Sequence, residues 1–311
     1  MNKQSRNSSI SSNWALFQSE LFSRMSHSSI DFPTVRCWNE TNLARLIRSS
    51  ASALGLKNVI PSAGAVIDQL VALNLAKRVE LESSAEGPSN RFAIIDFSTA
   101  ENHDLDPLEL AQALSPRGVL CYFGALSYHG LTTQVPPFYH VAELTMPEAG
   151  SSAIPNVKLR REPTAATIDR ETLGSLAFIY EGSPIYTTKR IARTVAGTKI
   201  YQQGPRTSYR MTSIEQSLLD TLHRPKPCGG PSVVFEAWEN GISQLKDEEL
   251  VRLLEGASPV LKRRAGAMLE RNDYRISPTL ESLLLDTPQL QVPLLPGYAF
   301  GTTMTRWGVL V

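Results

Sequence analysis

Apolar residues recur at helical spacing in three segments near the N-terminus. The first segment follows Asn13 and the second follows Asn39, and asparagine is a residue type that caps helices. The third segment holds four apolar residues at the spacing of one helical face, namely Val66, Ile67, Leu70 and Val71. The pattern therefore predicts three amphipathic helices before residue 76.

The pattern then changes to the alternation that is typical of strands. Residues 76–81 alternate between apolar and polar side chains, a polar turn covers residues 82–90, and residues 91–95 form a second strand-like segment. Three helices followed by strand, turn and strand is the order of elements in a winged helix-turn-helix domain. We therefore expect such a domain over residues 13–97, after a serine-rich disordered tail at residues 1–12.

A second region follows a polar linker at residues 98–104. Asp106, Pro107 and Glu109 have the types and spacing of a helix start, and a further helix is expected from Ser115 to Ser127.

Short segments rich in β-branched and aromatic residues then predict a sheet, at residues 138–144, 157–161, 176–180, 199–201 and 208–211. After Thr212, capping residues and prolines predict several more helices. The predicted fold class is α+β, in which a winged helix-turn-helix domain precedes a larger mixed α/β C-terminal domain over residues 106–311.

The charges are balanced overall but unevenly distributed. The formal net charge is +1, yet residues 96–150 carry −6 and residues 151–210 carry +6. Such blocks indicate segregated charged surfaces or chance clustering on solvated faces. Three widely spaced cysteines and the absence of an apolar leader favour a soluble, cytoplasmic protein without a membrane partner.

No motif of a known catalytic class is present in the sequence. The five histidines lack metal-binding spacing, and there is no nucleophile elbow or phosphate-binding loop. Glu181, Asp220 and Lys189 are a candidate nuclease set, but a chain of this length offers many such triples. Gly229 and Gly230 predict a tight turn into a helix whose N-terminus is able to bind an anion. We expect neither an enzyme nor a cofactor, with a nucleic-acid-processing C-terminal domain as the alternative.

Nucleic-acid binding is better supported by the residues. In a winged helix-turn-helix domain the N-terminal half of the third helix enters the major groove. The expected contacts are small or polar residues on that helix and cations beside it: Lys57, Asn58, Ser62, Ala63, Gln69, Lys77, Arg78 and Arg91. Because acidic residues lie in the same elements, a protein-interaction module is a further alternative.

A second basic surface is expected on the predicted sheet. It would include Lys158, Arg160, Arg161, Lys189, Arg190 and Arg193, with tyrosines interleaved. Cations with aromatic rings bind single-stranded nucleic acid or DNA phosphates, whereas the alternative is an ordinary solvated face or a partner surface.

Three motifs in order resemble the AbiEi-type antitoxins of abortive-infection systems. The first ends in Ala125-Leu126 and His129-Gly130-Leu131, the second is Ser217-Leu218-Leu219-Asp220, and the third runs from Arg264 to Glu270. Met268 stands where the family more commonly has leucine. The resemblance covers residues 14 to 271.

The resemblance implies a transcriptional regulator that binds inverted repeats of double-stranded DNA in its own promoter and represses it. It also implies an antitoxin that counteracts a nucleotidyltransferase-type toxin, not necessarily by direct contact. The family's C-terminal domain is credited with the antitoxin activity.

Overall fold

The computed structural model describes residues 3–26, 36–82, 94–97, 105–145, 173–204, 207–285, 291–298 and 301–311, with side chains from residue 12 in the first range. The chain divides into two compact units. Unit 1 comprises Met1–Arg117 together with Ala177–Gly182 and Ile200–Tyr209, and unit 2 comprises the other residues. Helices and sheets are mixed along the chain, as the sequence predicted.

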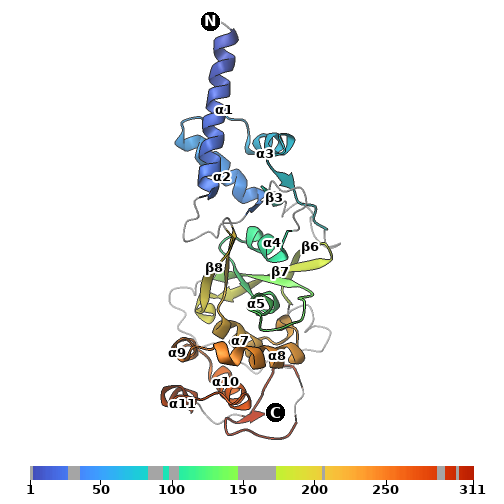
Figure 1. The fold of residues 1–311 in the computed structure, drawn as a ribbon, viewed down its shortest axis with the longest axis vertical. Helices are drawn as coiled ribbons and strands as arrows, with labels where there is room; N and C mark the ends of the chain where they lie inside the picture. The colour runs from blue at the N-terminus through green and yellow to red at the C-terminus, as the bar shows by residue number, and fades with distance from the viewer. Residues whose placement is uncertain are drawn as a thin grey trace. The chain divides into compact units, whose positions relative to one another are not determined.

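Three helices of unit 1 pack around an apolar core. They are α1 (Lys3–Ser26), α2 (Glu40–Ala53) and α3 (Ala63–Ala72), and Figure 1 shows α1 running alongside α2. Asn39 caps α2 by accepting hydrogen bonds from the N–H groups of Thr41 and Asn42, in agreement with the sequence. The helices bury fully enclosed side chains that include Phe17, Leu21, Leu43, Ile47, Ile67 and Leu70.

A three-stranded antiparallel sheet completes the first part of unit 1. Its order is β1 (Cys37–Asn39), β3 (Ile94–Asp96) and β2 (Lys77–Arg78). The helix α4 (Pro107–Leu114) belongs to the same unit, and Asp106 caps it as predicted. Glu109 of α4 accepts two hydrogen bonds from the Arg36 guanidinium, at 2.9 and 2.6 Å.

A six-stranded mixed sheet has the order β6-β7-β5-β4-β9-β8. Its strands are β4 (Val119–Cys121), β5 (Tyr139–Thr145), β6 (Ser175–Tyr180), β7 (Ser183–Ile191), β8 (Thr198–Gly204) and β9 (Thr207–Thr212). The pair β4 and β5 is antiparallel, whereas β5 pairs in parallel with β7 and β4 in parallel with β9. Paired strands such as β4 and β9 lie far apart in the sequence, so tertiary packing determines which strands pair in this sheet.

Helices make up most of the remainder of unit 2. They are α5 (Phe123–Tyr128), α7 (Ile214–His223), α8 (Pro231–Gly241), α9 (Asp247–Glu255), α10 (Pro259–Arg271) and α11 (Pro278–Leu285), as Figure 1 shows. A short parallel pair, β10 (Val292–Pro293) and β11 (Val309–Leu310), follows them. Trp238 and Trp307 are the largest of the fully buried side chains in the core of this unit.

One sequence prediction of secondary structure is wrong, and one strand was missed. The helix expected from Ser115 begins only at Phe123, because residues 119–121 form the buried strand β4 between two partners. The strand β7 was not predicted, because Pro184 suggests a break, although proline is tolerated near the start of a strand. The segment 157–161 lies outside the described residues.

The expected disordered tail also differs from the structure. The helix α1 begins at Lys3, and neither glycine nor proline interrupts residues 3–26. The amphipathic segment after Asn13 therefore continues toward the N-terminus as one helix.

Candidate nucleic-acid interface

The helix α3 starts at a polar cap, Ser62. Ser62 is exposed, and its Oγ accepts a hydrogen bond from the Ala65 N–H at 3.3 Å. Ala63, the first helical residue, is half-buried. The Ser62 hydroxyl oxygen thus caps the helix, and its O–H group remains able to donate a hydrogen bond.

The two faces of α3 differ in character. Val66, Ile67 and Leu70 are fully buried against the core of unit 1. The exposed positions carry small or polar side chains, namely Gly64, Ala65, Asp68, Gln69 and Ala72. A surface helix with such small side chains allows another macromolecule to approach its backbone closely.

Cationic residues stand before and after this helix in the chain. Lys57 and Asn58 are exposed in the turn between α2 and α3, and Lys77 and Arg78 are exposed on β2. Arg91 lies outside the described residues. Every described member of the predicted set except Ala63 is therefore solvent-exposed.

An ion pair links β2 to the exposed face of α3. The Arg78 guanidinium donates to Asp68 Oδ1 at 2.9 Å and lies 3.9 Å from a carboxylate oxygen of Glu40. The Arg78 and Asp68 side chains are 45% and 68% exposed. Exposed pairs of this kind contribute only about 0–1 kcal/mol, so a phosphate can compete with Asp68 for the guanidinium.

The second predicted basic surface is corrected at Arg190. Lys189 and Arg193 are exposed, but Arg190 is 7% exposed and is not part of any solvent-facing surface. Neighbouring residues on a strand point to opposite faces, so Lys189 and Arg190 of β7 are separated by its pleat. Lys158, Arg160 and Arg161 lie outside the described residues.

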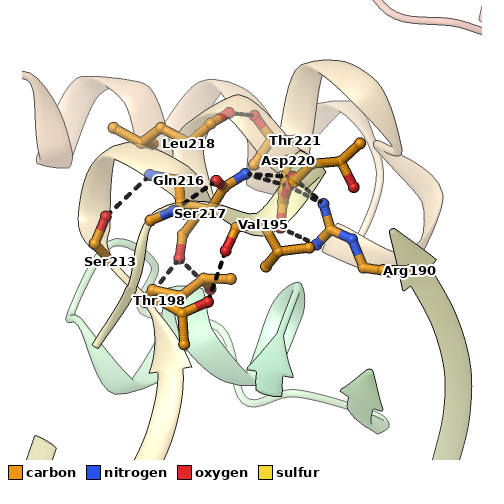
Figure 2. A network of polar contacts seen from close by, with 12 residues as sticks. Arg190, Val195, Thr198, Ser213, Gln216, Ser217, Leu218, Asp220 and Thr221 are labelled. Carbon is orange, nitrogen blue, oxygen red and sulfur yellow. Dashed lines mark hydrogen bonds and ion pairs between the residues drawn. The ribbon is translucent and has the colours of Figure 1, made fainter. Parts of the chain in front are cut away.

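Arg190 forms a buried ion pair instead. Figure 2 shows its guanidinium reaching from β7 to Asp220 on α7, where Nη1 and Nη2 meet the two carboxylate oxygens at 2.5 and 2.6 Å. Nη2 also donates to the Thr194 carbonyl oxygen at 3.2 Å. Burial alone would lower the pKa of Arg190, but the Asp220 carboxylate outweighs it and raises that pKa, so the guanidinium stays charged.

A wider polar network surrounds the pair. Gln216, one helical turn before Asp220, donates to its Oδ1 at 3.0 Å, and Gln216 Oε1 accepts the Gly197 N–H at 3.2 Å. Figure 2 also shows the Ser213 hydroxyl that caps α7 by accepting the Gln216 N–H. Ser213 directly follows Thr212, the residue after which the sequence predicts capping residues and helices.

The candidate nuclease set does not fit this arrangement. Both carboxylate oxygens of Asp220 are bonded to Arg190, and Lys189 extends from the opposite face of β7. Within the described ranges, no group of three or more His, Cys, Asp or Glu residues is arranged to hold a metal ion. The three cysteines are free and buried, and burial raises the pKa of Cys121 to about 12.

The family-like motifs contribute side chains to the interior of unit 2. His129 Nε2 lies 2.7 Å from the Thr212 carbonyl oxygen, and burial lowers the pKa of this imidazole. Arg264 is 8% exposed and donates to the carbonyl oxygens of Pro293 and Leu222 at 2.9 and 3.1 Å. Gly266 is packed so closely that an added Cβ would lie 2.7 Å from the Trp307 ring. These motif positions have structural roles in the described part of the chain.

Comparison with known proteins supports the fold alone. No model of a protein family matches the chain, and no curated protein matches it. Among solved structures, the crystal structure of RV2827C protein from Mycobacterium tuberculosis is similar, with a TM-score of 0.50 and 12% sequence identity. The similarity covers 94% of this chain and 90% of that chain, so the mixed α/β architecture is shared over nearly the full length.

The described helices do not include a membrane-spanning candidate. None of them combines the length and the apolar character that crossing a bilayer requires.

Proposed function

We propose that the chain is a DNA-binding transcriptional regulator whose unit 1 contains a winged helix-turn-helix domain. The observation that carries this proposal is the order α1, β1, α2, α3, β2, β3, together with the antiparallel sheet β1-β3-β2. Under this proposal α3 is the recognition helix, and β2 and β3 are the strands that flank the wing. The exposed face of α3 is available to DNA because the opposite face fills the core of unit 1.

The dimensions and chemistry of α3 suit a major groove. Its 10 residues give a length of about 15 Å, and the groove is about 12 Å wide. Gly64 and Ala65 allow close approach, and the Gln69 amide has the donor and acceptor needed to read adenine. Lys57, Lys77 and Arg78 would bind phosphates on either side of the helix.

The proposal is tested by titrating the full-length protein against labelled duplexes. Fluorescence anisotropy compares DNA from upstream of the protein's own gene with a random duplex of equal length, at several salt concentrations. We expect tighter binding to the upstream duplex and a logarithmic affinity that falls linearly with the logarithm of salt concentration. Equal affinity for both duplexes would contradict a sequence-specific regulator.

Two substitutions distinguish a contact to a DNA phosphate from a contact that reads a base. Lys77→Ala should weaken binding similarly for both duplexes and reduce the salt slope by about 0.9, the value for one phosphate contact. Gln69→Ala should change base preference and leave the slope intact. Lys246→Ala, which removes an exposed lysine of unit 2, is the matched control and should change neither quantity.

The antitoxin role is the second part of the proposal. It is supported by the resemblance of the three motifs, in their order along the chain, to those of AbiEi-type antitoxins. In this role the chain binds inverted repeats in its own promoter and relieves the effect of a nucleotidyltransferase-type toxin. The alternative of a protein-interaction module has the same fold but binds no operator.

The experiment expresses the chain together with a nucleotidyltransferase encoded beside its own gene and measures growth. Relief of growth arrest by the natural chain is the expected result, and persistent arrest would contradict the role. The Lys77→Ala and Gln69→Ala variants show whether this relief requires DNA binding.

A further inference from the structure

Unit 2 contains a cavity that the proposed DNA interface does not use. Its volume is about 330 Å³, which lies at the lower end of the range for small-molecule sites. Its lining includes the aromatic side chains of Phe123, Phe138 and Tyr298, the cationic Lys226, and Gly229 and Gly230. The loop residues Gln134, Val135 and Pro137 complete it. We call it the aromatic pocket.

The rings of the aromatic pocket are held in defined orientations. Phe138 makes edge contacts with Phe123 and Tyr186, with ring centroids 6.2 Å apart in each pair. His140 contacts Phe138 from another side at 5.4 Å. Tyr298 is half-buried, and burial raises the pKa of its phenol, so the O–H remains a hydrogen-bond donor. A flat ligand therefore meets rings that need little ordering on binding.

Positive charge, in contrast to the apolar rings, comes from the segment before α8. Gly229 and Gly230 have φ angles of +97° and +84°, which only glycine adopts readily in this combination. The first helical hydrogen bond runs from the Val234 N–H to the Gly230 carbonyl oxygen at 3.0 Å. Within the described ranges no side chain caps this end of the 11-residue helix. Lys226 and Gly230, the residue before α8, both line the cavity, so its lining includes a cation and the partial positive charge of a helix N-terminus.

At Gly229, glycine is also required for space. A Cβ at Gly229 would lie 2.6 Å from the Phe123 ring, and a Cβ at Gly230 would lie 3.5 Å from the Tyr298 hydroxyl. The bare backbone thus reaches the cavity wall between these two aromatic side chains.

The loop at residues 132–134, of which Gln134 lines the cavity, is fixed by one carboxylate. Glu236 of α8 accepts hydrogen bonds from the Thr133 N–H and Oγ1 and from the Thr132 Oγ1, each at 2.7 Å, and from the Gln134 side chain at 3.0 Å. The Thr133 bonds and then those from Thr132 and Gln134 lower the pKa of Glu236 to about 2. Because Gln134 itself lines the cavity, these hydrogen bonds to the ionised Glu236 hold this part of the cavity wall in place at neutral pH.

We propose that the aromatic pocket binds a planar aromatic ligand that carries one anionic group, with the size of a nucleoside monophosphate. The ring of the ligand stacks among Phe138 and Tyr298, and its anionic group lies toward Lys226 and the N-terminus of α8. An inorganic anion offers no ring to the aromatic side chains, and a neutral aromatic ligand offers no negative charge to Lys226 or to the helix N-terminus. A free nucleotide and an aromatic carboxylate share this chemistry.

Calorimetric titration of the full-length protein distinguishes the sources. The ligands are the four common 5′-nucleoside monophosphates and benzoate, with adenosine and inorganic phosphate as controls that each lack one feature. We expect saturable binding of a nucleotide or of benzoate, at least about tenfold tighter than that of either control. Binding of a nucleotide would identify the ligand class as free nucleotides, and binding of benzoate alone would identify it as aromatic carboxylates.

Variants locate the binding. Lys226→Gln should weaken binding of the anionic ligand by about tenfold or more because it removes a charged partner. Tyr298→Leu, at a half-buried surface position, removes a stacking ring and should weaken the same ligand, while Lys246→Gln should leave affinity unchanged. Circular dichroism and thermal unfolding verify that each variant is folded.

Two results would overturn the proposal. The first is an absence of saturable binding for every aromatic anion at millimolar concentration. The second is binding that Lys226→Gln and Tyr298→Leu leave unchanged in folded protein. Neither result depends on whether unit 1 binds DNA, because the titrations contain no duplex.

Discussion

Replacement of Arg190 by methionine tests whether this residue belongs to the interior or to a nucleic-acid surface. Its side chain is 6% exposed and that of Asp220 is 2% exposed. The guanidinium makes two charge-assisted hydrogen bonds to Asp220 and a third to the Thr194 carbonyl. Arg190→Met therefore leaves a buried carboxylate with Gln216 as its remaining donor among the described contacts.

The magnitude follows from burial. Removing one partner of a buried ion pair costs about 3–5 kcal/mol, because the remaining charge loses its compensation without regaining water. We expect Arg190→Met to lower the free energy of unfolding of unit 2 by this amount. The double variant Arg190→Met/Asp220→Leu should lose much less than the sum of the single variants, because it removes both charges together.

Urea unfolding followed by tryptophan fluorescence measures the effect. Trp238 and Trp307 are fully buried in unit 2, whereas Trp14 and Trp38 belong to unit 1. A background in which Trp14 and Trp38 are replaced by phenylalanine therefore reports on unit 2. Lys189→Met, at the exposed neighbouring position, is the control and should change stability by less than about 0.5 kcal/mol.

The result that would refute this reasoning is specific. If Arg190→Met unfolds with the same midpoint and slope as Lys189→Met, the buried ion pair contributes nothing. If it also reduces the salt slope of DNA binding by about one, Arg190 contacts phosphate as the sequence alone suggested.

Four further predictions concern single side chains. Ser62→Ala should destabilise unit 1 by about 1 kcal/mol through loss of the α3 cap, which a Ser62→Asp variant should largely restore in urea unfolding. Burial lowers the pKa of His140 from its ordinary value of 6.5 to about 4. The neutral ring therefore contributes fully to the free energy of unfolding above pH 6.5, and this contribution falls as the pH drops toward 4. The pH dependence of unfolding across this window should be lost in His140→Gln. Because the pKa of Glu236 is lowered from 4.5 to about 2, the stabilisation from its hydrogen bonds is complete above pH 4.5 and is lost as the pH falls toward 2. Glu236→Gln should speed hydrogen exchange of the loop at residues 132–134 at neutral pH. Gly266→Ala should destabilise unit 2 by about 1–3 kcal/mol, and unchanged thermal unfolding would contradict the close packing against the Trp307 ring.

The sequence predicted those features that local chemistry determines. The caps at Asn39 and Asp106 could be found from residue type and spacing alone. The amphipathic pattern of residues 66–71 likewise identified the buried face of α3, because apolar residues at helical spacing share one side of the helix.

Features that depend on distant partners were not predictable in the same way. The strand β4 is a short, fully buried apolar segment, and such segments do not distinguish strand from helix by periodicity. Assigning Arg190 to the interior required recognition of β7 and of the fact that Asp220, 30 positions later, faces it. The cavity walls are likewise brought together from segments more than a hundred residues apart.

The division of the chain has a consequence for folding during synthesis. Unit 1 recruits Ala177–Gly182 and Ile200–Tyr209 after the intervening residues of unit 2 have been made. Glu82 pairs through its backbone with Ile179, while Asp106 and Glu109 accept hydrogen bonds from Tyr209 and Thr207. A nascent chain that has emerged only to Arg117 therefore lacks these partners, and contacts of such long sequence separation slow folding. Unit 1 is therefore complete only after the chain has been synthesised as far as Tyr209.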